Sequence, residues 1–450
     1  MENSKFMDSL LTLAGKMQSN KVLNAISAAF IDFMPVTITG SLAVLFRWVI
    51  SQTGGVTTTL ADGTEKYTAY LSVANLPGMK WLSALNPFWD TVNYGCVNFI
   101  AVGICVLVAL HFAENLGREK DYTAAMVALG CFIATAGLQY VTDDAGTKTI
   151  SSVTTLTTDF TSASGLFVAL IMGILATLLY VKLGDSGKLT IKLPDTVPPN
   201  VVKSFEVLFP SMLTIFIVVL IAWALMAFTG VTLFNLINTI MAPLQNLMTG
   251  LPGACVIGFF AQLLWWFGIH GNNVLSPVMT PFLTTSTLAN LEAYNGDPYA
   301  LPNIITNQFM SFYRNGTGSG VTIGWIIAVF LFSKREDFKA IAKLAIPCGI
   351  FNINEPIIFG VPMVMNPLFA IPWFAAPICV VIVGYILTAI NLTPRFAIDV
   401  PWTTPIGIGP FLAAGGNIMA AIVNLVVVIG VSTLIYAPFV IAANSQTEEA

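Results

Sequence analysis

The chain has 450 residues, of which 56% are hydrophobic and only 9% are charged, and its formal net charge is -4. Soluble domains carry roughly 25% charged residues, so this composition excludes an ordinary soluble enzyme and indicates an integral membrane protein. Nothing in the sequence supports binding of nucleic acid, and we expect no such partner.

The first expected element is an amphipathic helix in the stretch "MENSKFMDSLLTLAGKM", where Lys and Asp interrupt the apolar residues. The stretch lacks the continuous apolar region of a cleaved signal peptide. We therefore expect a helix that lies on the membrane.

Ten apolar runs follow, and each is long enough to cross hydrocarbon, which takes about 20 residues. They cover residues 26–50, 94–116, 121–141, 163–182, 204–229, 252–269, 273–290, 317–333, 368–391 and 412–439. The predicted fold class is an all-α membrane protein with about ten transmembrane helices, broken or re-entrant segments and the N-terminal amphipathic helix. No polar domain is appended, so residues 1–450 are read as a single membrane domain.

The basic residues predict the orientation, because Lys and Arg accumulate in short cytoplasmic loops. With the N-terminus inside, the cytoplasmic set is Lys5, Lys16, Lys21, Arg118, Lys120, Lys182, Lys188, Lys192, Lys203, Lys334, Arg335, Lys339 and Lys343. The opposite loops hold Lys66, Lys80 and Lys148. Both termini are therefore predicted to be cytoplasmic.

The connecting segments carry no catalytic motif. Residues 51–75 and 142–162 are rich in Thr, Ser, Gly and Asp, as solvated external loops usually are. Residues 183–203 combine lysines with "LPDTVPPN", whose prolines cannot continue a helix, and are expected to form a cytoplasmic linker between two halves. All six cysteines lie in apolar segments without a CxxC pair and are read as packing residues.

Two regions resist a simple helical interpretation: 265–282, "WWFGIHGNNVLSPVMTPF", and 346–367, "IPCGIFNINEPIIFGVPMVMNP". Gly, Asn and Pro dominate both. Non-helical backbone at membrane depth is tolerated where protein buries it or where it lines a watery cavity. Broken segments therefore indicate a substrate site.

Glu355 is the most informative residue, because a carboxylate in apolar surroundings is costly unless it is protonated, hydrogen-bonded or functionally solvated. One interpretation is that it caps the backbone N–H groups freed by the bend from Asn352 to Pro356. The other is that it serves as a base or hydrogen-bond acceptor for a polar substrate.

His270 and Trp402 each have one structural and one functional interpretation. His270, in "IHGNN", is either a satisfied core residue or a group for binding and proton handling. Trp402, in "DVPWTTPIGIGP", is either an interfacial anchor or an aromatic face for a sugar ring. Asp32, Arg47, Arg314 and Arg395 are further charges near membrane depth, and their partners cannot be read from the sequence.

The sequence lacks the motifs of several common catalytic and metal sites. The sequence has no GxxxxGK[ST] loop, so the chain is not an ATPase by itself, and it has no HExxH or CxxC motif. We expect neither a cofactor nor a metal.

The motifs "GIHGNN" and "NINEPIIFGVPMVMNP" resemble those of the membrane-embedded IIC component of the bacterial sugar phosphotransferase system, in its lactose, cellobiose and chitobiose branch. The resemblance covers essentially the whole chain. It implies a permease in the bacterial cell membrane that binds a β-linked disaccharide, moves it inward and presents its C6 hydroxyl for phosphorylation. It also implies a homodimer, with most dimer contacts in residues 1–203 and the sugar-binding half in residues 204–440.

The resemblance also implies partners and site residues. The phosphoryl donor would be a phosphocysteine on a separate cytosolic IIB protein, itself served by IIA and the general phosphotransferase proteins, so that IIC alone is the permease of a multi-component sugar phosphotransferase. The expected catalytic residues are Glu355 and His270. The expected substrate-binding residues are Glu355, His270, Asn272, Asn273, Asn354, Trp402 and Trp265.

Two other interpretations remain at this stage. A proton-coupled secondary sugar transporter would use Glu355 and His270 as a proton relay. A channel-like or scaffold protein leaves the two broken segments unexplained.

The charge asymmetry leads to a prediction about topology. A reporter fused after Lys203 or Lys343 should read cytoplasmic, and one inserted near Asp144 should read external, because basic residues are retained inside. The opposite reading at any of these sites would contradict the ten-crossing arrangement.

Overall fold

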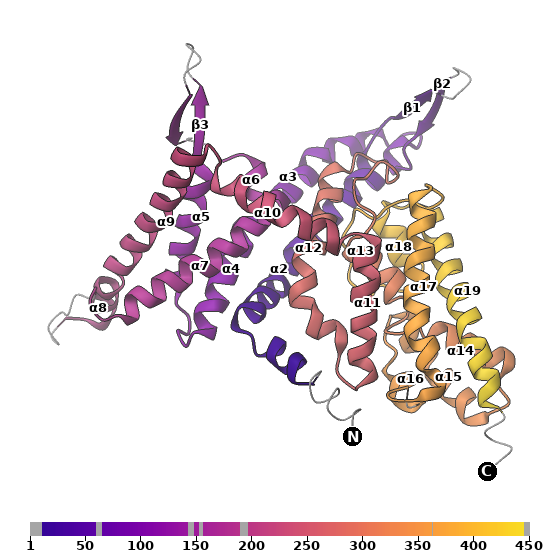
Figure 1. The fold of residues 1–450 in the computed structure, drawn as a ribbon. Coiled ribbons are helices and arrows are strands. Elements are labelled where there is room, and N and C mark those ends of the chain that lie inside the picture. Colours follow the sequence, from indigo (N-terminus) through magenta and orange to yellow (C-terminus); the bar gives the residue numbers. More distant parts are fainter. Residues whose placement is uncertain are drawn as a thin grey trace. The chain divides into compact units, whose positions relative to one another are not determined.

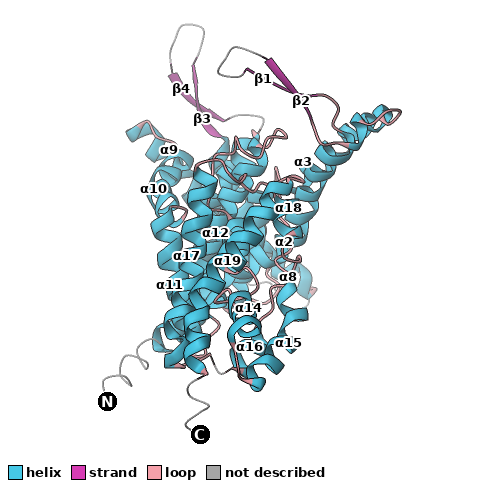
Figure 2. Cartoon of the chain, turned by 90° about the vertical axis from the view of Figure 1, so that its right-hand side faces the viewer, coloured by secondary structure: helices cyan, strands magenta, loops and turns pink. Residues whose placement is uncertain are grey.

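The computed structural model describes residues 11–59, 65–142, 148–152, 156–189, 197–361 and 363–444. Within these ranges the chain is almost entirely helical, and two short hairpins form the only sheets (Figure 2). The predicted all-α membrane class is confirmed. Of the expected N-terminal helix, residues 11–18 are helical and the first ten residues lie outside the described part.

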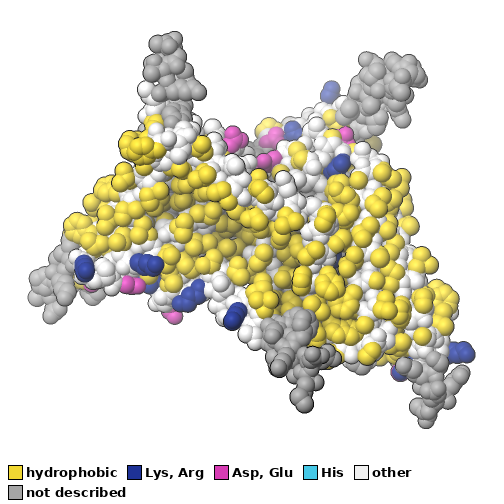
Figure 3. All heavy atoms as spheres, viewed as in Figure 1, with side chains coloured by type: hydrophobic (Ala, Val, Ile, Leu, Met, Phe, Trp, Pro, Cys, Tyr) yellow, Lys and Arg dark blue, Asp and Glu magenta, His cyan; other side chains and the backbone are white. Residues whose placement is uncertain are grey.

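Six helical stretches of the described chain are long and apolar enough to cross a bilayer: Lys21–Ser51, Lys80–Asn115, Ala163–Asp185, Ser204–Thr229, Pro367–Ala389 and Ile418–Ala443. A seventh arises if α10 (Leu233–Met248) and α11 (Leu251–Trp266), which meet at 68°, form one broken span. Figure 3 shows hydrophobic side chains covering the helices around α9 and around α17, with the visible charged side chains near helix ends. The chain is therefore a multi-pass membrane protein, and the total of ten crossings stays a prediction.

One compact unit comprises Thr12–Thr37 and Cys96–Asn246 (Figure 1). Its elements are the first part of α2 (Lys21–Phe46), α4 (Ile100–Asn115), α5 (Tyr122–Gly137), β3 (Leu138–Thr142), β4 (Lys148–Ser152), α6 (Thr158–Thr161), α7 (Leu166–Asp185), α8 (Pro199–Glu206), α9 (Leu208–Thr229) and most of α10. Helices α4 and α5 pack on α7, and α9 packs on both α5 and α7. Gly173 allows the close approach of α7 to α4, since a Cβ there would lie 3.0 Å from Cγ1 of Val108.

The other unit comprises Met1–Leu11, Ile38–Gly95 and Leu247–Ala450. Its early elements are the end of α2, the π-helix η1 (Arg47–Ser51), β1 (Gly55–Thr59), β2 (Glu65–Ala69), the 3-10 helices η2 (Val73–Asn75) and η3 (Lys80–Leu85), and α3 (Asn86–Cys96). Its later elements are α11, α12 (Gly271–Ala293), α13 (Asn307–Phe309), the π-helix η5 (Met310–Arg314), α14 (Ile323–Phe332), α15 (Glu336–Ile350), α16 (Glu355–Gly360), the 3-10 helix η6 (Pro367–Phe369), α17 (Ala370–Ala389), α18 (Ile408–Ala413) and α19 (Ile418–Ala443).

The core of this unit lies where α14 and α17 pack against α19. Trp325, Trp373 and Tyr436 are fully buried there. The Tyr436 hydroxyl donates a hydrogen bond to the carbonyl of Gly320 at 2.9 Å, and the Trp373 indole donates to the carbonyl of Gln262 at 3.1 Å. The polar groups of both side chains therefore donate hydrogen bonds to buried carbonyls, while the rings fill the core.

Two segments expected to be loops contain antiparallel hairpins. β1 pairs with β2 from Gly55 opposite Ala69 to Thr59 opposite Glu65, and β3 pairs with β4 from Leu138 opposite Ser152 to Thr142 opposite Lys148. Thr, Val and Tyr favour extended backbone, which accounts for the pairing. The predicted helical run 121–141 is therefore wrong at its end, because α5 stops at Gly137. Part of the predicted linker, residues 190–196, lies outside the described residues.

The predicted helix 317–333 is also wrong at its start, because α14 begins at Ile323. The segment before it, "NGTGSG" at 315–320, is a turn with left-handed backbone at Thr317 (φ 67°), Gly318 (φ 97°) and Gly320 (φ 81°). A Cβ on Gly318 would lie 2.3 Å from Cγ of Asn354. Two glycines therefore let this turn adopt left-handed backbone, and the one at 318 also permits its close approach to Asn354.

The predicted run 412–439 is interrupted as well. Helix α18 ends at Ala413 and α19 begins at Ile418, with Gly415 (φ 67°) and Gly416 (φ 85°) between them. The structure also contains α10 and α15, which were not among the predicted crossings.

We predict that Gly318→Ala destabilises the fold. The new Cβ would occupy space held by Asn354 and would strain the left-handed backbone, so we expect a loss of about 2 kcal/mol or more in the free energy of unfolding. Melting of the purified protein in detergent measures the effect. Gly430→Ala is the matched control, because a Cβ there meets nothing within 4 Å. Equal melting temperatures for the two variants would contradict the close approach.

Candidate functional site

The break between α11 and α12 places His270 at the N-cap of α12. Its Nδ1 accepts a hydrogen bond from the backbone N–H of Asn273 at 3.3 Å. A neutral imidazole that accepts at Nδ1 carries its proton on Nε2, so His270 presents an N–H donor. Gly271 is required here, since a Cβ on it would lie 2.0 Å from the carbonyl oxygen of Ala261.

Trp265 supports this histidine from the end of α11. The Trp265 and His270 ring centroids are 4.4 Å apart and the rings are tilted by 50°. Trp265 is buried, whereas His270 is half-buried. The packing of one ring on the other restricts the orientation of the imidazole.

Glu355 begins α16 at the second break. Its side chain is exposed and forms neither a hydrogen bond nor a salt bridge with the part of the chain that the structure describes. The carboxylate is therefore not used to hydrogen-bond the backbone of the bend, and it remains available to a ligand.

Backbone contacts join the two breaks. The N–H of Met365 donates to the carbonyl of Trp266 at 3.2 Å. A Cβ on Gly268 would lie 3.9 Å from Cγ1 of Val364. The chain after the Glu355 helix thus lies directly against the chain before His270.

A third broken segment, residues 310–322, lies beside both motifs. Arg314 is buried, and its Nη2 donates to Oδ1 of Asn272 at 3.0 Å while its Nε donates to Oδ1 of Asn315 at 3.3 Å. Asn272 in turn donates from Nδ2 to Oγ of Ser319 at 3.3 Å. Amide oxygens therefore hold the guanidinium, which has no carboxylate partner among the described residues.

Asn354 fastens the same segment to the second break. It is 3% exposed, and its Nδ2 donates to the carbonyl of Ser319 at 2.6 Å and to Oγ1 of Thr322 at 2.9 Å. Both N–H groups of this amide are thus used within the protein. These contacts anchor the residue before Glu355 to the segment 310–322.

Asn352 links the second break to the Trp402 segment. Its Oδ1 accepts from the N–H of Thr317 at 2.9 Å, and its Nδ2 donates to the carbonyls of Trp402 at 2.7 Å and Thr404 at 3.0 Å. Asn352 has left-handed backbone, with φ 64°. Trp402 itself is 56% exposed, so its indole is accessible.

All seven predicted site residues lie in one unit. Trp265 packs on His270, and Asn272 and Asn354 both hydrogen-bond Ser319. Glu355 directly follows Asn354. The side chain of Asn273 is exposed, and its backbone N–H serves the His270 cap. Trp402 joins through its backbone. The sequence analysis did not select Asn352 as a tether, and it did not select the segment 310–322. The closely spaced glycines of that segment were the signal that could have indicated a break there.

The other charges have structural partners. Arg47 pairs with Asp90 at 2.6 Å between Nε and Oδ1, and His111 contacts Asp32 at 2.8 Å between Nε2 and Oδ2. Arg395 donates from Nη1 to Oδ1 of Asn391 at 3.1 Å. These contacts give the three charges roles outside the candidate site.

We predict that Asn352→Asp loosens the site. The carboxylate keeps the acceptor for Thr317 but replaces both donated hydrogen bonds by repulsion from carbonyl oxygens, so we expect a loss of about 1–3 kcal/mol in the free energy of unfolding. Thermal melting in detergent measures it. Asn366→Asp is the control, because the side-chain oxygen of Asn366 accepts from the N–H of Leu368 at 3.1 Å and Asp retains that role. Equal losses of unfolding free energy in the two variants would contradict the role of Asn352 as a tether between the second break and the Trp402 segment.

Comparison with known proteins identifies the family. Residues 24–377 match the family model "Phosphotransferase system, EIIC". The chain is 31% identical to the cellobiose-specific EIIC component of Lactococcus lactis subsp. lactis (strain IL1403), over 98% of this chain and 97% of the relative. It is 30% identical to the oligo-beta-mannoside-specific EIIC component of Bacillus subtilis (strain 168), over 94% of this chain and 90% of that relative.

A solved structure agrees with these relatives. The crystal structure of the transporter ChbC, the IIC component of the N,N'-diacetylchitobiose-specific phosphotransferase system, superposes with a TM-score of 0.81 at 28% identity, covering 98% of each chain. The chain therefore belongs to the EIIC family of the phosphotransferase system.

Proposed function

We propose that this permease carries a β-linked disaccharide such as cellobiose, lactose or chitobiose and presents its C6 hydroxyl for phosphorylation. The names of the relatives favour β-linked sugars. The observation that carries the proposal is an exposed carboxylate, Glu355, that has no protein hydrogen bond in the described chain and begins a broken segment whose backbone contacts the segment before His270.

The proposed phosphoryl donor is a phosphocysteine on a cytosolic IIB protein. The C6 oxygen attacks phosphorus, the S–P bond breaks, and the cysteine leaves as a thiolate. Glu355 accepts the hydroxyl proton during the attack. His270 donates from Nε2 to an oxygen of the phosphoryl group, where negative charge is concentrated.

The remaining predicted residues would hold the sugar around this centre. The exposed Trp402 ring suits the apolar C–H face of a pyranose, and the exposed Asn273 side chain supplies hydrogen-bonding groups for hydroxyls. Asn272 is shared with Arg314, and Trp265 lies behind His270. We assign Asn354 a positioning role, because its amide nitrogen is used within the fold.

The proposal extends to the assembly. The chain would work as a homodimer in the bacterial cell membrane, with dimer contacts in residues 1–203, the sugar in residues 204–440 and both termini in the cytoplasm. IIB would be its direct partner, with IIA and the general phosphotransferase proteins acting upstream. Arg335 precedes α15 (Glu336–Ile350) and Lys339 lies within it, and the charge bias predicts that this helix begins on the cytoplasmic side, where IIB would bind.

We predict that Glu355→Gln inserts and melts like the parent, binds cellobiose measurably, and phosphorylates it at a rate reduced by roughly 10²-fold or more. The amide keeps the shape of the carboxylate but cannot accept the proton, and 10²–10⁴-fold is the usual scale for such a loss. Phosphorylation by phosphorylated IIB, equilibrium binding and thermal melting are measured on one preparation.

Glu336→Gln is the control for this variant, because Glu336 is an exposed carboxylate of α15 whose salt bridge is with Lys339. Lower melting with near-normal turnover in Glu355→Gln would favour a capping role. Uptake by the parent without IIB, coupled to a pH gradient that the variant no longer uses, would favour a proton-coupled transporter. Normal phosphorylation would remove Glu355 from the mechanism.

We predict that His270→Gln separates chemistry from binding. Gln keeps a donor but loses the imidazole, so phosphorylation should fall more than cellobiose affinity does. The comparison uses single-turnover transfer from phosphorylated IIB and equilibrium dialysis of cellobiose. If the two quantities fall equally, His270 is chiefly a sugar ligand.

A further inference from the structure

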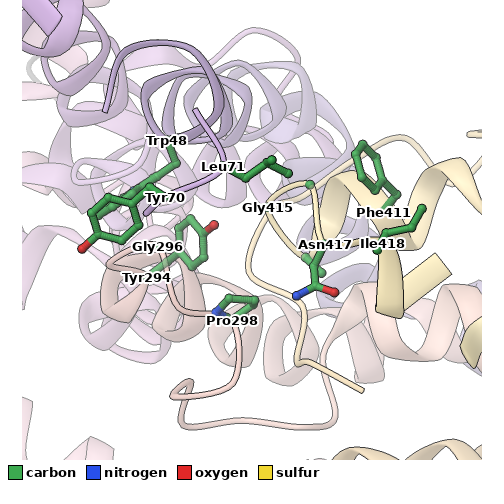
Figure 4. Close-up of a pocket in the computed structure, with 12 residues that line it drawn as sticks. Trp48, Tyr70, Leu71, Tyr294, Gly296, Pro298, Phe411, Gly415, Asn417 and Ile418 are labelled. Carbon is green, nitrogen blue, oxygen red and sulfur yellow. The ribbon is translucent and has the colours of Figure 1, made fainter. Parts of the chain in front are cut away.

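A cavity of about 300 Å³ lies in the same unit as the candidate site but is lined by different residues (Figure 4). Its wall includes Trp48 of η1, Tyr70 after β2, Tyr294 at the end of α12, Phe411 of α18, and Asn417 and Ile418 at the start of α19. Its volume is at the lower end of the range of small-molecule pockets, about 300–1,000 Å³.

The cavity is far from the catalytic centre along α12. His270 is the N-cap of α12 and Tyr294 is its C-cap, and the helix between them has 23 residues. At 1.5 Å per residue this is on the order of 30 Å. The cavity is therefore a separate place and cannot be an extension of the Glu355 site.

The aromatic wall is held in place by its neighbours. The Trp48 ring meets Tyr70 edge-on with centroids 5.2 Å apart, and it meets Tyr294 in the same way at 5.7 Å. The Arg47 guanidinium lies 5.1 Å from the Trp48 centroid and is fixed in turn by Asp90. A ring contacted in this way presents a preformed surface to a ligand.

Glycines open the space beside these rings. A Cβ on Gly415 would lie 1.8 Å from the Tyr294 hydroxyl oxygen, and a Cβ on Gly296 would lie 2.5 Å from the Trp48 ring. Both glycines have left-handed backbone. The aromatic side chains can therefore approach the backbone of two loops, whose peptide groups contribute polar atoms to the wall.

The polar groups of the cavity are neutral. Asn417 accepts from the N–H of Met419 at 2.9 Å through Oδ1, while its Nδ2 makes no hydrogen bond within the described chain. All the lining residues are uncharged. A phosphate headgroup or a charged peptide would find no counter-charge in the wall, whereas a pyranose offers an apolar C–H face to aromatic rings and hydroxyls to amide and phenol groups.

We propose that this cavity is a second sugar site, which takes one pyranose ring of the disaccharide that the permease carries. The proposal rests on the proposed sugar-permease function. A weak site of this kind raises the occupancy of sugar near the transporter without taking part in phosphorylation.

The test fills the cavity with Ile418→Trp. Ile418 is 62% exposed, so the fold should accept the larger side chain, and Ile422→Trp one turn further along α19, 49% exposed and outside the lining, is the matched control. Each change is made singly in the otherwise unaltered protein, because the proposed function expects Glu355 and His270 variants to keep measurable cellobiose binding at the first site. Cellobiose binding is measured by calorimetry on protein in lipid nanodiscs.

We expect two sugars per chain in the parent and in Ile422→Trp, and one sugar per chain in Ile418→Trp, with affinity at the second site reduced at least tenfold. One sugar per chain in the parent, or two sugars per chain that Ile418→Trp leaves unchanged, would overturn the second site. Failure of the unaltered protein to bind or transport any β-linked disaccharide would instead overturn the proposed function.

Discussion

Backbone that leaves the helical pattern inside a membrane must find hydrogen-bond partners within the protein, because hydrocarbon offers none. Amide side chains, one buried and one half-buried, meet this requirement where the second break contacts the segment 310–322. Asn354 donates two hydrogen bonds to this segment, and Asn352 accepts one from it while donating two to the Trp402 region. Removing such a partner leaves a buried polar group unsatisfied, which costs about 1–3 kcal/mol. The arrangement of the remaining site depends on these contacts.

The same contacts explain why a carboxylate in this region can be reactive. The amides carry the structural hydrogen bonds, so Glu355 has none to make within the described chain. His270 is fixed by its own cap and by Trp265, which leaves its second nitrogen free to donate. The amides therefore hold the backbone, and the proposed mechanism assigns the two titratable groups to the sugar and the phosphoryl group.

The sequence predicts the membrane class and the breaks at His270 and Glu355, because composition and the Gly, Asn and Pro content act locally. The re-entrant turn before α14 escaped prediction because its flanking residues are as apolar as those of a helix, and hydropathy averages over them. The Asn352 contact joins residues 50 positions apart and is a tertiary interaction without a local pattern. Strand β3 was read as the end of a helix, and β1, β2 and β4 were read as loops because Thr serves both in solvated loops and in strands.

The central claim is that the sugar's reacting hydroxyl lies between Glu355 and His270 while the amides of Asn352 and Asn354 hold the backbone. An electron cryomicroscopy structure with cellobiose bound tests it most directly. We expect density for the disaccharide with its C6 hydroxyl within hydrogen-bond distance of both the Glu355 carboxylate and His270 Nε2, and with the Asn354 amide still bonded to Ser319. A sugar bound with its C6 hydroxyl away from both side chains, or with Asn354 released to the sugar, would contradict it.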